Sequence, residues 1–537
     1  MRFEQQMSAC LRPATVLAAA LCLFASGRVV SASEQQSTAQ PPATMATQAV
    51  PAGPQIQISA DEAVRMALEN NLGIQASRLS PQAQAFALAQ TRAAYAPTVF
   101  SNSTKNSSSN PPSNFLSGSG FVTNGGFRSN AGVAQQLKWG GGSYQLSLDG
   151  ARNTTSDPSD PFNPRLSSSF SFNYTQPLLR NFTIDPTRQQ LALGEKQAEI
   201  VDVQLQQQLT QTARNVRNAY YDLVGAIGQL DVARASLQLA QQQLKDNQTK
   251  VEVGVLAPID IIEAQAEVSQ REEAVIVSEA RIRTLEDNLR TLVMNPSQPD
   301  FWTARLVPTE QPVLTARAVD LDAAIRNALA NRTDLVQARK QLEQTDISLK
   351  FGRNQRLPSV NAVVNYGLAG VAGTRTLYEN DSSGFPIATG TAVRSFSDAL
   401  RDVFGNEFKT WSIQFQVSYP IGQSTADAGL AQGRIQRQQE VATLQQLETQ
   451  VIASVRDAAR QVDTTLKRVE ATKRAREFAE RRYEAEQKRM TVGLSTTFQL
   501  FQAQRDLSSQ KQAELNAIIA YNRALVNFEA VQSVPVR

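Results

Sequence analysis

The feature that most constrains this chain is a proline-free stretch that is far too long for a helix in a compact domain. It runs from Pro186 to Pro258, and its apolar residues largely alternate between spacings of three and four positions, which is coiled-coil periodicity. From Pro186 to Gly254 is 254 − 186 = 68 positions, or roughly 100 Å of continuous helix. We expect this helix to reverse at Gly254 and to return as a second helix to about Asn295.

The same arrangement occurs again in the C-terminal part of the chain. A second long helical pattern follows Pro420, and a Val-Gly pair at Val492 and Gly493 interrupts it, 493 − 254 = 239 positions after the first pair. The sequence therefore predicts two long helical hairpins, at 186–295 and 424–531.

The two hairpins belong to an internal duplication. Segment 58–78 matches segment 319–339 at an offset of 322 − 61 = 261 positions, and Pro97 has its counterpart in Pro358. Because such landmarks keep their order, we predict a mixed α+β protein built from two repeats of one plan. Each repeat has an opening helix that ends at its proline, then strands, then a hairpin, and the first repeat adds a proline-rich loop that packs beside the helices. The predicted ranges are 58–318 and 319–537 for the repeats, 98–177 and 358–421 for the strands, and 296–318 for the loop.

The strand regions alternate between apolar and uncharged polar residues with a period of two. Aromatic residues alternate with Ser, Asn and Thr in 169–175, and the segment 411–419 has the same pattern. Alternation of this kind is typical of barrel strands that face lipid on one side, although a half-buried strand of a soluble β-sandwich has it too. The side chains predicted to face lipid are Phe170, Phe172, Tyr174, Ile413, Phe415, Val417 and Tyr419.

Stretches rich in Ser, Asn and Gly surround these strands. Segments 101–114 and 377–391 are of this kind, and we predict them to be long exposed loops. Segment 133–150 is different, because two alternating runs flank the turn sequence WGGG. It predicts an extra hairpin in the first repeat, at about 130–150. The sequence leaves open whether this hairpin lies in a barrel or in an extracellular loop.

The N-terminus predicts export from the cytoplasm. Basic residues precede an apolar segment, and small residues near Ala32 suit a cleavage site, so residues 1–32 are predicted to be a signal peptide. Both cysteines, Cys10 and Cys22, fall within it. Residues 33–57 are rich in Gln, Ser, Thr, Ala and Pro, and they are predicted to form a flexible segment.

Composition argues against several kinds of function. The chain has no histidine, and its 53 basic and 49 acidic residues leave a net charge of only +4, so we expect neither a metal site nor nucleic-acid binding. The basic run 467–489 is interleaved with glutamates, which is typical of an ion-paired helix surface. No constellation of catalytic side chains is recognisable either. We therefore predict no catalytic residues, no cofactor and no enzymatic activity.

The order and spacing of these features resemble the TolC-like outer membrane efflux proteins. The shared features are the duplicated plan, the motif DEAVRMALENN, the aromatic stretch SFNYTQPLL and the Val-Gly-Leu-Ser turn at 492–495. The resemblance implies a homotrimer in outer membrane lipid, in which each chain adds four strands to one twelve-stranded barrel. We accordingly predict four or more strands per chain in a shared trimeric transmembrane barrel. The resemblance also implies that the hairpins form a tunnel across the periplasm. On physical grounds, four lipid-facing strands cannot close a barrel alone, so association is required.

The resemblance further implies that the hairpin turns meet a periplasmic adaptor (membrane fusion) protein, which links them to an inner-membrane transporter. Glycine permits close backbone approach, and the neighbouring apolar side chains can be buried by a partner. The alternative is that Gly254 and Gly493 only reverse the chain. The expected docking residues are Val253, Gly254, Val255 and Leu256 in the first hairpin and Val492, Gly493, Leu494 and Ser495 in the second.

In the resembled family, acidic residues just beyond these turns line the tunnel entrance and help to close it. Asp260 and Glu263 occupy those positions in the first hairpin, three residues apart and so on one helix face. The second hairpin has Gln499 and Gln502 instead, so charge at the entrance is expected from the first hairpin only. In a trimer each carboxylate would form a ring that attracts cations. The alternative is an ordinary solvated helix face.

These expectations describe a passive exit duct in the outer membrane. It would conduct substrates from an inner-membrane pump to the exterior, as part of a tripartite efflux or type I secretion system. The alternatives are a general outer membrane porin and a periplasmic coiled-coil scaffold. The long helices argue against the porin, and the aromatic strands argue against the scaffold.

Overall fold

The structure is a computed structural model that describes residues 54–111, 120–157, 159–310, 317–380, 384, 386–422 and 424–532. The predicted signal peptide at 1–32 and most of the predicted flexible segment, residues 33–53, lie outside the described residues. All elements described below belong to the unit formed by Ala52–Arg537.

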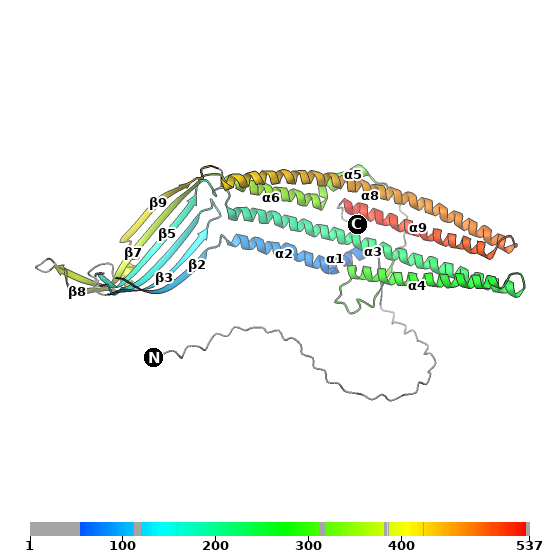
Figure 1. The fold of residues 1–537 in the computed structure, drawn as a ribbon, viewed down its shortest axis with the longest axis horizontal. Helices are drawn as coiled ribbons and strands as arrows, with labels where there is room; N and C mark the ends of the chain where they lie inside the picture. Colours follow the sequence, from blue (N-terminus) through cyan, green and yellow to red (C-terminus); the bar gives the residue numbers. More distant parts are fainter. Residues whose placement is uncertain are drawn as a thin grey trace, which may run out of the picture. The chain divides into compact units, whose positions relative to one another are not determined.

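Two long helical hairpins dominate this unit, and they have equal lengths in the two repeats. The first helix of each hairpin has 67 residues and the second has 35. Each first helix begins at a side-chain cap, which is Asp185 or Ser424. No helix in the described ranges has an apolar stretch long enough to cross a bilayer. The four helices are α3 (Pro186–Glu252), α4 (Ile259–Val293), α8 (Thr425–Thr491) and α9 (Thr497–Val531), and both turns lie at the same end (Figure 1).

The opening helix of each repeat is broken into two, which corrects the expectation of a single helix. At the breaks, Asn71 and Arg332 have extended conformations with ψ of 120° and 125°. Asn71 accepts a hydrogen bond from the Ile74 N–H at 3.2 Å and donates one to the Leu292 carbonyl at 3.1 Å. The first bond caps the helix that follows the break, and the second ties the break to α4. The helices are α1 (Ala60–Asn70) and α2 (Leu72–Ala93) in the first repeat, and α5 (Leu321–Asn331) and α6 (Thr333–Gln355) in the second.

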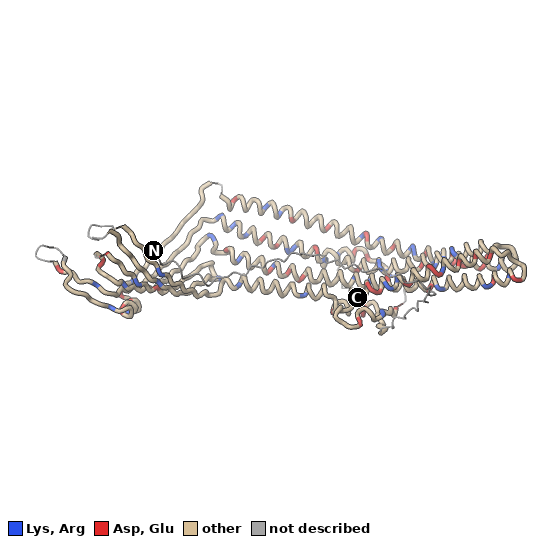
Figure 2. Tube along the Cα trace, turned by 60° about the horizontal axis from the view of Figure 1, so that its bottom comes forward, with Lys and Arg blue, Asp and Glu red and all other residues tan. Residues whose placement is uncertain are grey.

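Charges of both signs are spread along the helices, whereas the strands carry few of them (Figure 2). In the basic run of α8, Arg476 lies 2.9 Å from Glu480 and 2.6 Å from Glu514 of α9. Arg482 lies 2.9 Å from Asp506 of α9. The run is therefore an ion-paired helix surface, as the sequence predicted.

An antiparallel sheet lies at the opposite end of the long helices from the turns (Figure 1). Its strands follow the order β2-β3-β4-β5-β7, and both β8 and β9 pair with β7, toward opposite ends of that strand. The extra hairpin is β3–β4, and it is hydrogen-bonded to β2 on one side and to β5 on the other. It is therefore part of the sheet and not a separate loop. The strands are β2 (Thr98–Asn110), β3 (Val122–Gln136), β4 (Ser143–Thr155), β5 (Phe162–Pro177), β7 (Ser359–Asn380), β8 (Pro386–Arg394) and β9 (Phe408–Ser418).

Two segments that were expected to be loops are largely strands, so this prediction was wrong. Residues 101–110 belong to β2, and residues 377–380 and 386–391 belong to β7 and β8. Their backbone groups are satisfied by pairing, whatever their side chains are. Hydroxyl groups also meet across the strands, as Ser103 and Ser129 do at 2.9 Å. A composition rich in Ser and Asn is therefore compatible with a strand here.

A short helix, α7 (Phe396–Phe404), was not predicted. It connects β8 to β9, and it starts with a capping box formed by Ser395 and Asp398. Its buried residues include Ala399 and Val403. The helix lies directly on β7, because a Cβ atom built on Gly370 would be only 2.0 Å from the Ala399 carbonyl oxygen. Glycine at this position allows the close approach.

A small parallel sheet joins the start of the first repeat to its proline-rich loop. β1 (Gln55–Ile58) pairs with β6 (Arg305–Pro308), so residues 55–57 are a strand and not part of a flexible segment. Phe301 and Leu306 from this loop are buried in one hydrophobic core cluster with Tyr220 of α3 and Leu289 of α4. The proline-rich loop thus packs against the helices.

Four charged side chains join the two repeats between α3 and α6. Lys196 lies 2.9 Å from both Glu199 and Glu343, and Lys340 lies 2.7 and 3.3 Å from the same two carboxylates. Hydrogen bonds from Lys340 and Lys196 lower the pKa of Glu199, and a hydrogen bond from Lys196, with a smaller effect of Lys340, lowers the pKa of Glu343. Both carboxylates are thus stabilised in their charged form.

We expect the contact between α3 and α6 to weaken in acid. Because the pKa of Glu199 and that of Glu343 are lowered on folding, their contribution to the free energy of unfolding is fully present above the ordinary value of 4.5. It is lost as the pH falls through the lowered values. Thermal unfolding at neutral pH and at about pH 3 compares the wild type with the Glu199→Gln/Glu343→Gln variant. Between neutral pH and pH 3 the Tm of the wild type should fall by more than the Tm of the variant. Equal decreases in Tm would contradict this expectation.

Candidate functional site

The two hairpins reverse in the same way. Gly254 and Gly493 both have φ of 78°, a left-handed conformation that glycine adopts without strain. The Val255 N–H donates to the Lys250 carbonyl at 2.8 Å, and the Gly254 N–H donates to the Val251 carbonyl at 3.0 Å. This is the Schellman motif of a helix C-terminus, and the Gly493 turn repeats it. A Cβ atom on either glycine would meet nothing within 4 Å, so these glycines serve the backbone conformation.

Exposed apolar side chains surround both turns, and we call this set the tip patch. Each of its members is between 59% and 72% exposed. Ile259, Ile262 and Phe498 were not assigned to this surface from the sequence. The sequence does place each of them at the start of the helix that follows a reversal, which is the signal that could have identified them. The tip patch consists of Val253, Val255, Ile259, Ile262, Val492, Leu494 and Phe498.

Two of the predicted docking residues are engaged in the turns themselves. Leu256 is half-buried. The Ser495 hydroxyl contacts the Glu486 carboxylate of α8 and lies 3.1 Å from Oε1 of Gln499 on α9. Ser495 therefore links the two helices of its hairpin, and its hydroxyl is not a free surface group.

The predicted entrance residues lie just beyond the turns. Asp260 is half-buried in the first turn of α4, and Glu263 is exposed one turn farther on. Gln499 and Gln502 are exposed at the start of α9, and Gln502 donates a hydrogen bond to the Asp506 carboxylate at 3.1 Å. One hairpin thus carries a pair of carboxylates where the other carries a pair of amides.

A buried ion cluster that the sequence did not reveal links the two hairpins near their turns. Glu267 of α4 is only 4% exposed, and its carboxylate lies 2.5 Å from Arg271 of the same helix and 3.3 Å from Arg505 of α9. In the sequence, Glu267 and Arg271 look like an ordinary surface pair, because the burial comes from the other hairpin. Arg505 also lies 6.0 Å from the centroid of the Phe498 ring. This cluster helps to fix how the hairpins lie against each other.

The sheet places the predicted lipid-facing side chains on one face. Directly paired residues of antiparallel strands share a face, and one row across five strands is Val133–Leu146–Phe172–Tyr366–Trp411. The row beside it, on the opposite face, is Gly132–Ser147–Ser171–Gly367–Thr410. One face is therefore apolar and aromatic, and the other is small and polar. By the same alternation, the apolar face also carries Phe170, Tyr174, Ile413, Phe415 and Val417, and Tyr419 directly follows β9.

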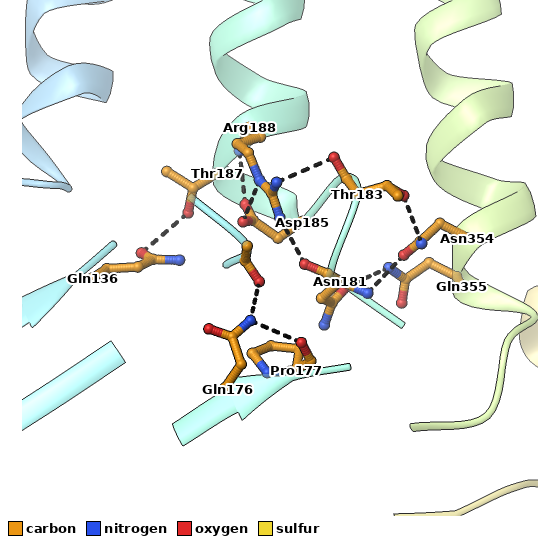
Figure 3. A network of polar contacts seen from close by, with 11 residues as sticks. Gln136, Gln176, Pro177, Asn181, Thr183, Asp185, Thr187, Arg188, Asn354 and Gln355 are labelled. Carbon is orange, nitrogen blue, oxygen red and sulfur yellow. Dashed lines mark hydrogen bonds and ion pairs between the residues drawn. The ribbon is translucent and has the colours of Figure 1, made fainter. Parts of the chain in front are cut away.

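A polar network joins the sheet to the long helices (Figure 3). Asp185 caps α3 by accepting a hydrogen bond from the Arg188 N–H at 2.8 Å, and the Arg188 guanidinium donates to the Asp185 carboxylate at 2.7 Å. The guanidinium also donates to the Asn181 carbonyl at 2.6 Å. Asn354, at the end of α6, accepts from the Asn181 N–H at 2.7 Å. The network therefore includes both repeats.

The WGGG turn of hairpin β3–β4 packs against this network. Gly140 and Gly141 have φ of 63° and 67°, and a Cβ atom on Gly141 would lie 2.5 Å from the Asn181 carbonyl oxygen. Gln176 of β5 donates a hydrogen bond to the Gly140 carbonyl at 2.8 Å (Figure 3). The hairpin is thus held at its turn as well as along both of its strands.

Comparison with known proteins finds relatives among outer membrane proteins. A family model described as outer membrane efflux protein matches residues 63–293 and 324–531. The outer membrane protein TolC of Salmonella enteritidis is 23% identical over 340 residues, and that of Escherichia coli (strain K12) is 22% identical over 340 residues. These matches cover 62% of this chain and 62% and 63% of the relatives, so less than two thirds of either relative is covered.

Solved structures resemble the fold over more of the chain. The Campylobacter jejuni CmeC outer membrane channel has a TM-score of 0.61 at 14% identity, over 88% of this chain and 85% of that chain. The outer membrane protein VceC of Vibrio cholerae has a TM-score of 0.62 at 13% identity, over 89% and 97%. At these identities the likeness concerns the fold alone. The predicted α+β architecture with an internal duplication is confirmed.

Proposed function

The chain belongs to the outer membrane efflux protein family and resides in the outer membrane, and from this we propose that it is the exit duct of a tripartite efflux or type I secretion system. Three copies form the duct. An inner-membrane transporter supplies the substrates, and a periplasmic adaptor protein connects it to the duct. The duct itself is passive, because the transporter provides the energy.

The observation that carries this proposal is the pair of equal hairpins that extend away from the sheet. A helix of 67 residues is roughly 100 Å long. The turns therefore lie far from any lipid that surrounds the sheet, where a partner from another membrane can reach them. Neither a porin nor a compact periplasmic protein needs helices of this length.

We propose that the tip patch is the docking surface for the adaptor. A chain reversal requires only the two glycines, whereas seven large apolar side chains are exposed beside them. Burial of such side chains at the centre of a contact is the main source of affinity between proteins. Leu256 and Ser495 then support the turns, and they contribute to docking through the shape of the turn.

We propose that Asp260 and Glu263 form the charged part of the duct entrance. In a trimer each position supplies three carboxylates, and rings of carboxylates favour cations. Gln499 and Gln502 stand at the corresponding places on the second hairpin without charge. Any cation preference at the entrance therefore arises from the first hairpin.

The two faces of the sheet suit a barrel wall. We propose that the apolar face, with Phe172 and Trp411 in its central row, contacts lipid, and that the small polar face lines the water-filled lumen. A soluble scaffold would leave this apolar face exposed to water, which disfavours that alternative. Within the described ranges no group of three His, Cys, Asp or Glu residues could hold a metal ion, and we propose no enzymatic role.

Planar-bilayer conductance tests this function. Protein extracted from the outer membrane in detergent should have the mass of a trimer and should form channels. Asp260→Asn should lower the cation preference, measured as the reversal potential in a salt gradient, because a ring of charge is lost. Glu272→Gln removes an exposed carboxylate farther along α4, and it should leave the reversal potential unchanged.

Other outcomes of this experiment point to the alternatives. A monomer that partitions with soluble periplasmic extract and does not conduct would overturn the channel function. A large conductance that is constantly open without any partner would favour the general porin.

A further inference from the structure

The sheet of this chain is wider than the family resemblance implies. Six strands lie side by side, in the order β2-β3-β4-β5-β7-β9, instead of four. The second repeat supplies β7 and β9 between Pro358 and Pro420, and the duplication matches them to β2 and β5, which lie between Pro97 and Pro177. Hairpin β3–β4 has no counterpart in the second repeat, so it is an insertion that widens the sheet.

The inserted hairpin is a full member of the sheet. Every residue of β2, from Thr98 to Asn110, pairs with β3, and residues 143–153 of β4 pair with β5. The hydroxyl groups of Ser147 and Ser171 meet at 2.7 Å across the β4–β5 boundary. The apolar face also continues through the hairpin, with Val133 and Leu146 in the row that contains Phe172. The insertion is therefore paired on both sides and continues the apolar face of the sheet.

The sheet has two unpaired edges in the described part of the chain. β2 forms one edge and pairs only with β3. The other edge is formed by β9 and, farther along, by β8, both of which pair only with β7. Nearly all side chains of β2 and β9 are exposed, and these two strands have similar lengths of 13 and 11 residues. Unpaired backbone groups at an edge are too costly to leave in lipid. A second copy of the same chain offers the complementary edge.

We propose that β9 of one copy pairs with β2 of the next, so that three copies close a barrel of eighteen strands instead of twelve. This inference rests on the trimer of the proposed function. It gives both edges a partner and keeps the insertion in the wall. Because barrel diameter grows roughly in proportion to strand number, the barrel would be roughly 1.5 times as wide as one of twelve strands.

The side chains of the two edge strands support this pairing. On the apolar face β2 contributes Val99, Ser101, Ser103 and Lys105. Only one of these side chains is apolar, so β2 itself offers little apolar surface to lipid. β9 carries Trp411 and Phe415 on that face, and both are exposed. Large aromatic side chains reach across to neighbouring strands, so β9 would shield the polar β2 of the next copy.

The wider barrel changes which part of the duct limits the size of its cargo. Each chain adds six strands to the barrel, but at any level it would add four helices to the tunnel. These are α2, α3, α6 and α8 next to the sheet, and α3, α4, α8 and α9 next to the turns (Figure 1). The exit would therefore be wider than the tunnel that feeds it. The tunnel and its entrance, and not the barrel, then set the upper size of a hydrophilic cargo.

Labelling of single cysteines tests whether the insertion lies in the wall. The natural cysteines, Cys10 and Cys22, are in the predicted signal peptide. In the exported chain the introduced cysteine is then the one that the reagent labels. A water-soluble maleimide is added to outer membranes that contain the full chain. In each pair the lumen-side cysteine should react roughly tenfold or more faster than its lipid-side neighbour. The pairs are Gln145→Cys against Leu146→Cys on β4, and Asn130→Cys against Ala131→Cys on β3. A hairpin outside the wall has water on both sides, so equal rates within both pairs would overturn the proposal.

Oxidative cross-linking tests the pairing between copies. Ser412→Cys on β9 is combined in turn with Asn102→Cys, Thr104→Cys or Asn106→Cys on β2, all on the polar face. At least one combination should give products of two and three chains, whereas Ser412→Cys with Gln145→Cys on an inner strand should give none. Absence of any product with β2 would overturn the pairing. Trimer mass and conductance report the proposed function separately, so a conducting trimer that fails these tests disproves the eighteen-stranded barrel alone.

Discussion

Aspartate in place of both Val255 and Leu494 should abolish export while leaving the duct assembled in the outer membrane. Both side chains belong to the tip patch and are exposed, so the folded chain should tolerate their replacement. If the adaptor buries them, two charges at the centre of an apolar contact should weaken docking by about 2 kcal/mol or more, which is roughly thirtyfold.

Export is measured as tolerance of the compounds to which a strain without this chain becomes sensitive. Trimer mass in detergent shows whether the variant still assembles. The matched control is Ile276→Asp with Val277→Asp, because these side chains are 67% and 60% exposed but lie midway along α4. The control should export like the wild type. Normal export by an assembled tip variant would show that docking does not use the tip patch.

The hairpins could be predicted because their determinants are local. Freedom from proline, coiled-coil spacing and a glycine at the reversal each act over a few residues. The duplication repeats each of these signals in the second half of the chain, so a chance pattern is a poor explanation for them. In the structure Gly254 and Gly493 have the same φ and make the same capping hydrogen bonds. The turns were therefore the most predictable part of the candidate site.

The sheet was less predictable, because its strands depend on their neighbours. β5 and β9 have alternating apolar residues that mark them in the sequence. β2 is polar on both faces beyond Phe100, and only its pairing with β3 makes it a strand. Hairpin β3–β4 could be predicted from its own pattern, but its place between β2 and β5 could not. That place depends on the pairing of β3 with β2 and of β4 with β5, which the pattern of the hairpin itself does not specify.

Burial of charge was the part of the site that the sequence could not show. Glu267 and Arg271 stand four residues apart, which is the spacing of a solvated ion pair on a helix surface. Their burial is caused by α9, which lies more than two hundred residues farther along the chain. The breaks at Asn71 and Arg332 depend in the same way on contacts with distant helices. Local pattern cannot encode such contacts.

A second buried ion pair fixes the first hairpin to the proline-rich loop. Arg290 and Glu286 of α4 are 4% and 7% exposed, and their side chains meet at 3.2 Å. The Arg290 guanidinium also donates to the Ala304 carbonyl at 2.6 Å, and the Glu286 carboxylate accepts from the Leu306 N–H at 2.7 Å. Both charges are therefore held between α4 and the segment that becomes β6.

Arg290→Ala should lower the free energy of unfolding by about 3–5 kcal/mol, because it leaves the Glu286 carboxylate buried without its counter-charge. Urea unfolding of the detergent-solubilised protein measures the loss. Arg65→Ala is the control, since Arg65 pairs with Glu62 and Glu69 on an exposed helix face, and it should leave the stability nearly unchanged. Glu286→Leu combined with Arg290→Met should recover only part of the loss. No charge then remains buried, but the Leu306 N–H and the Ala304 carbonyl lose their side-chain partners. If Arg290→Ala is as harmless as Arg65→Ala, the buried pair does not hold the loop to the hairpin, and the apolar contacts of Phe301 and Leu306 do so alone.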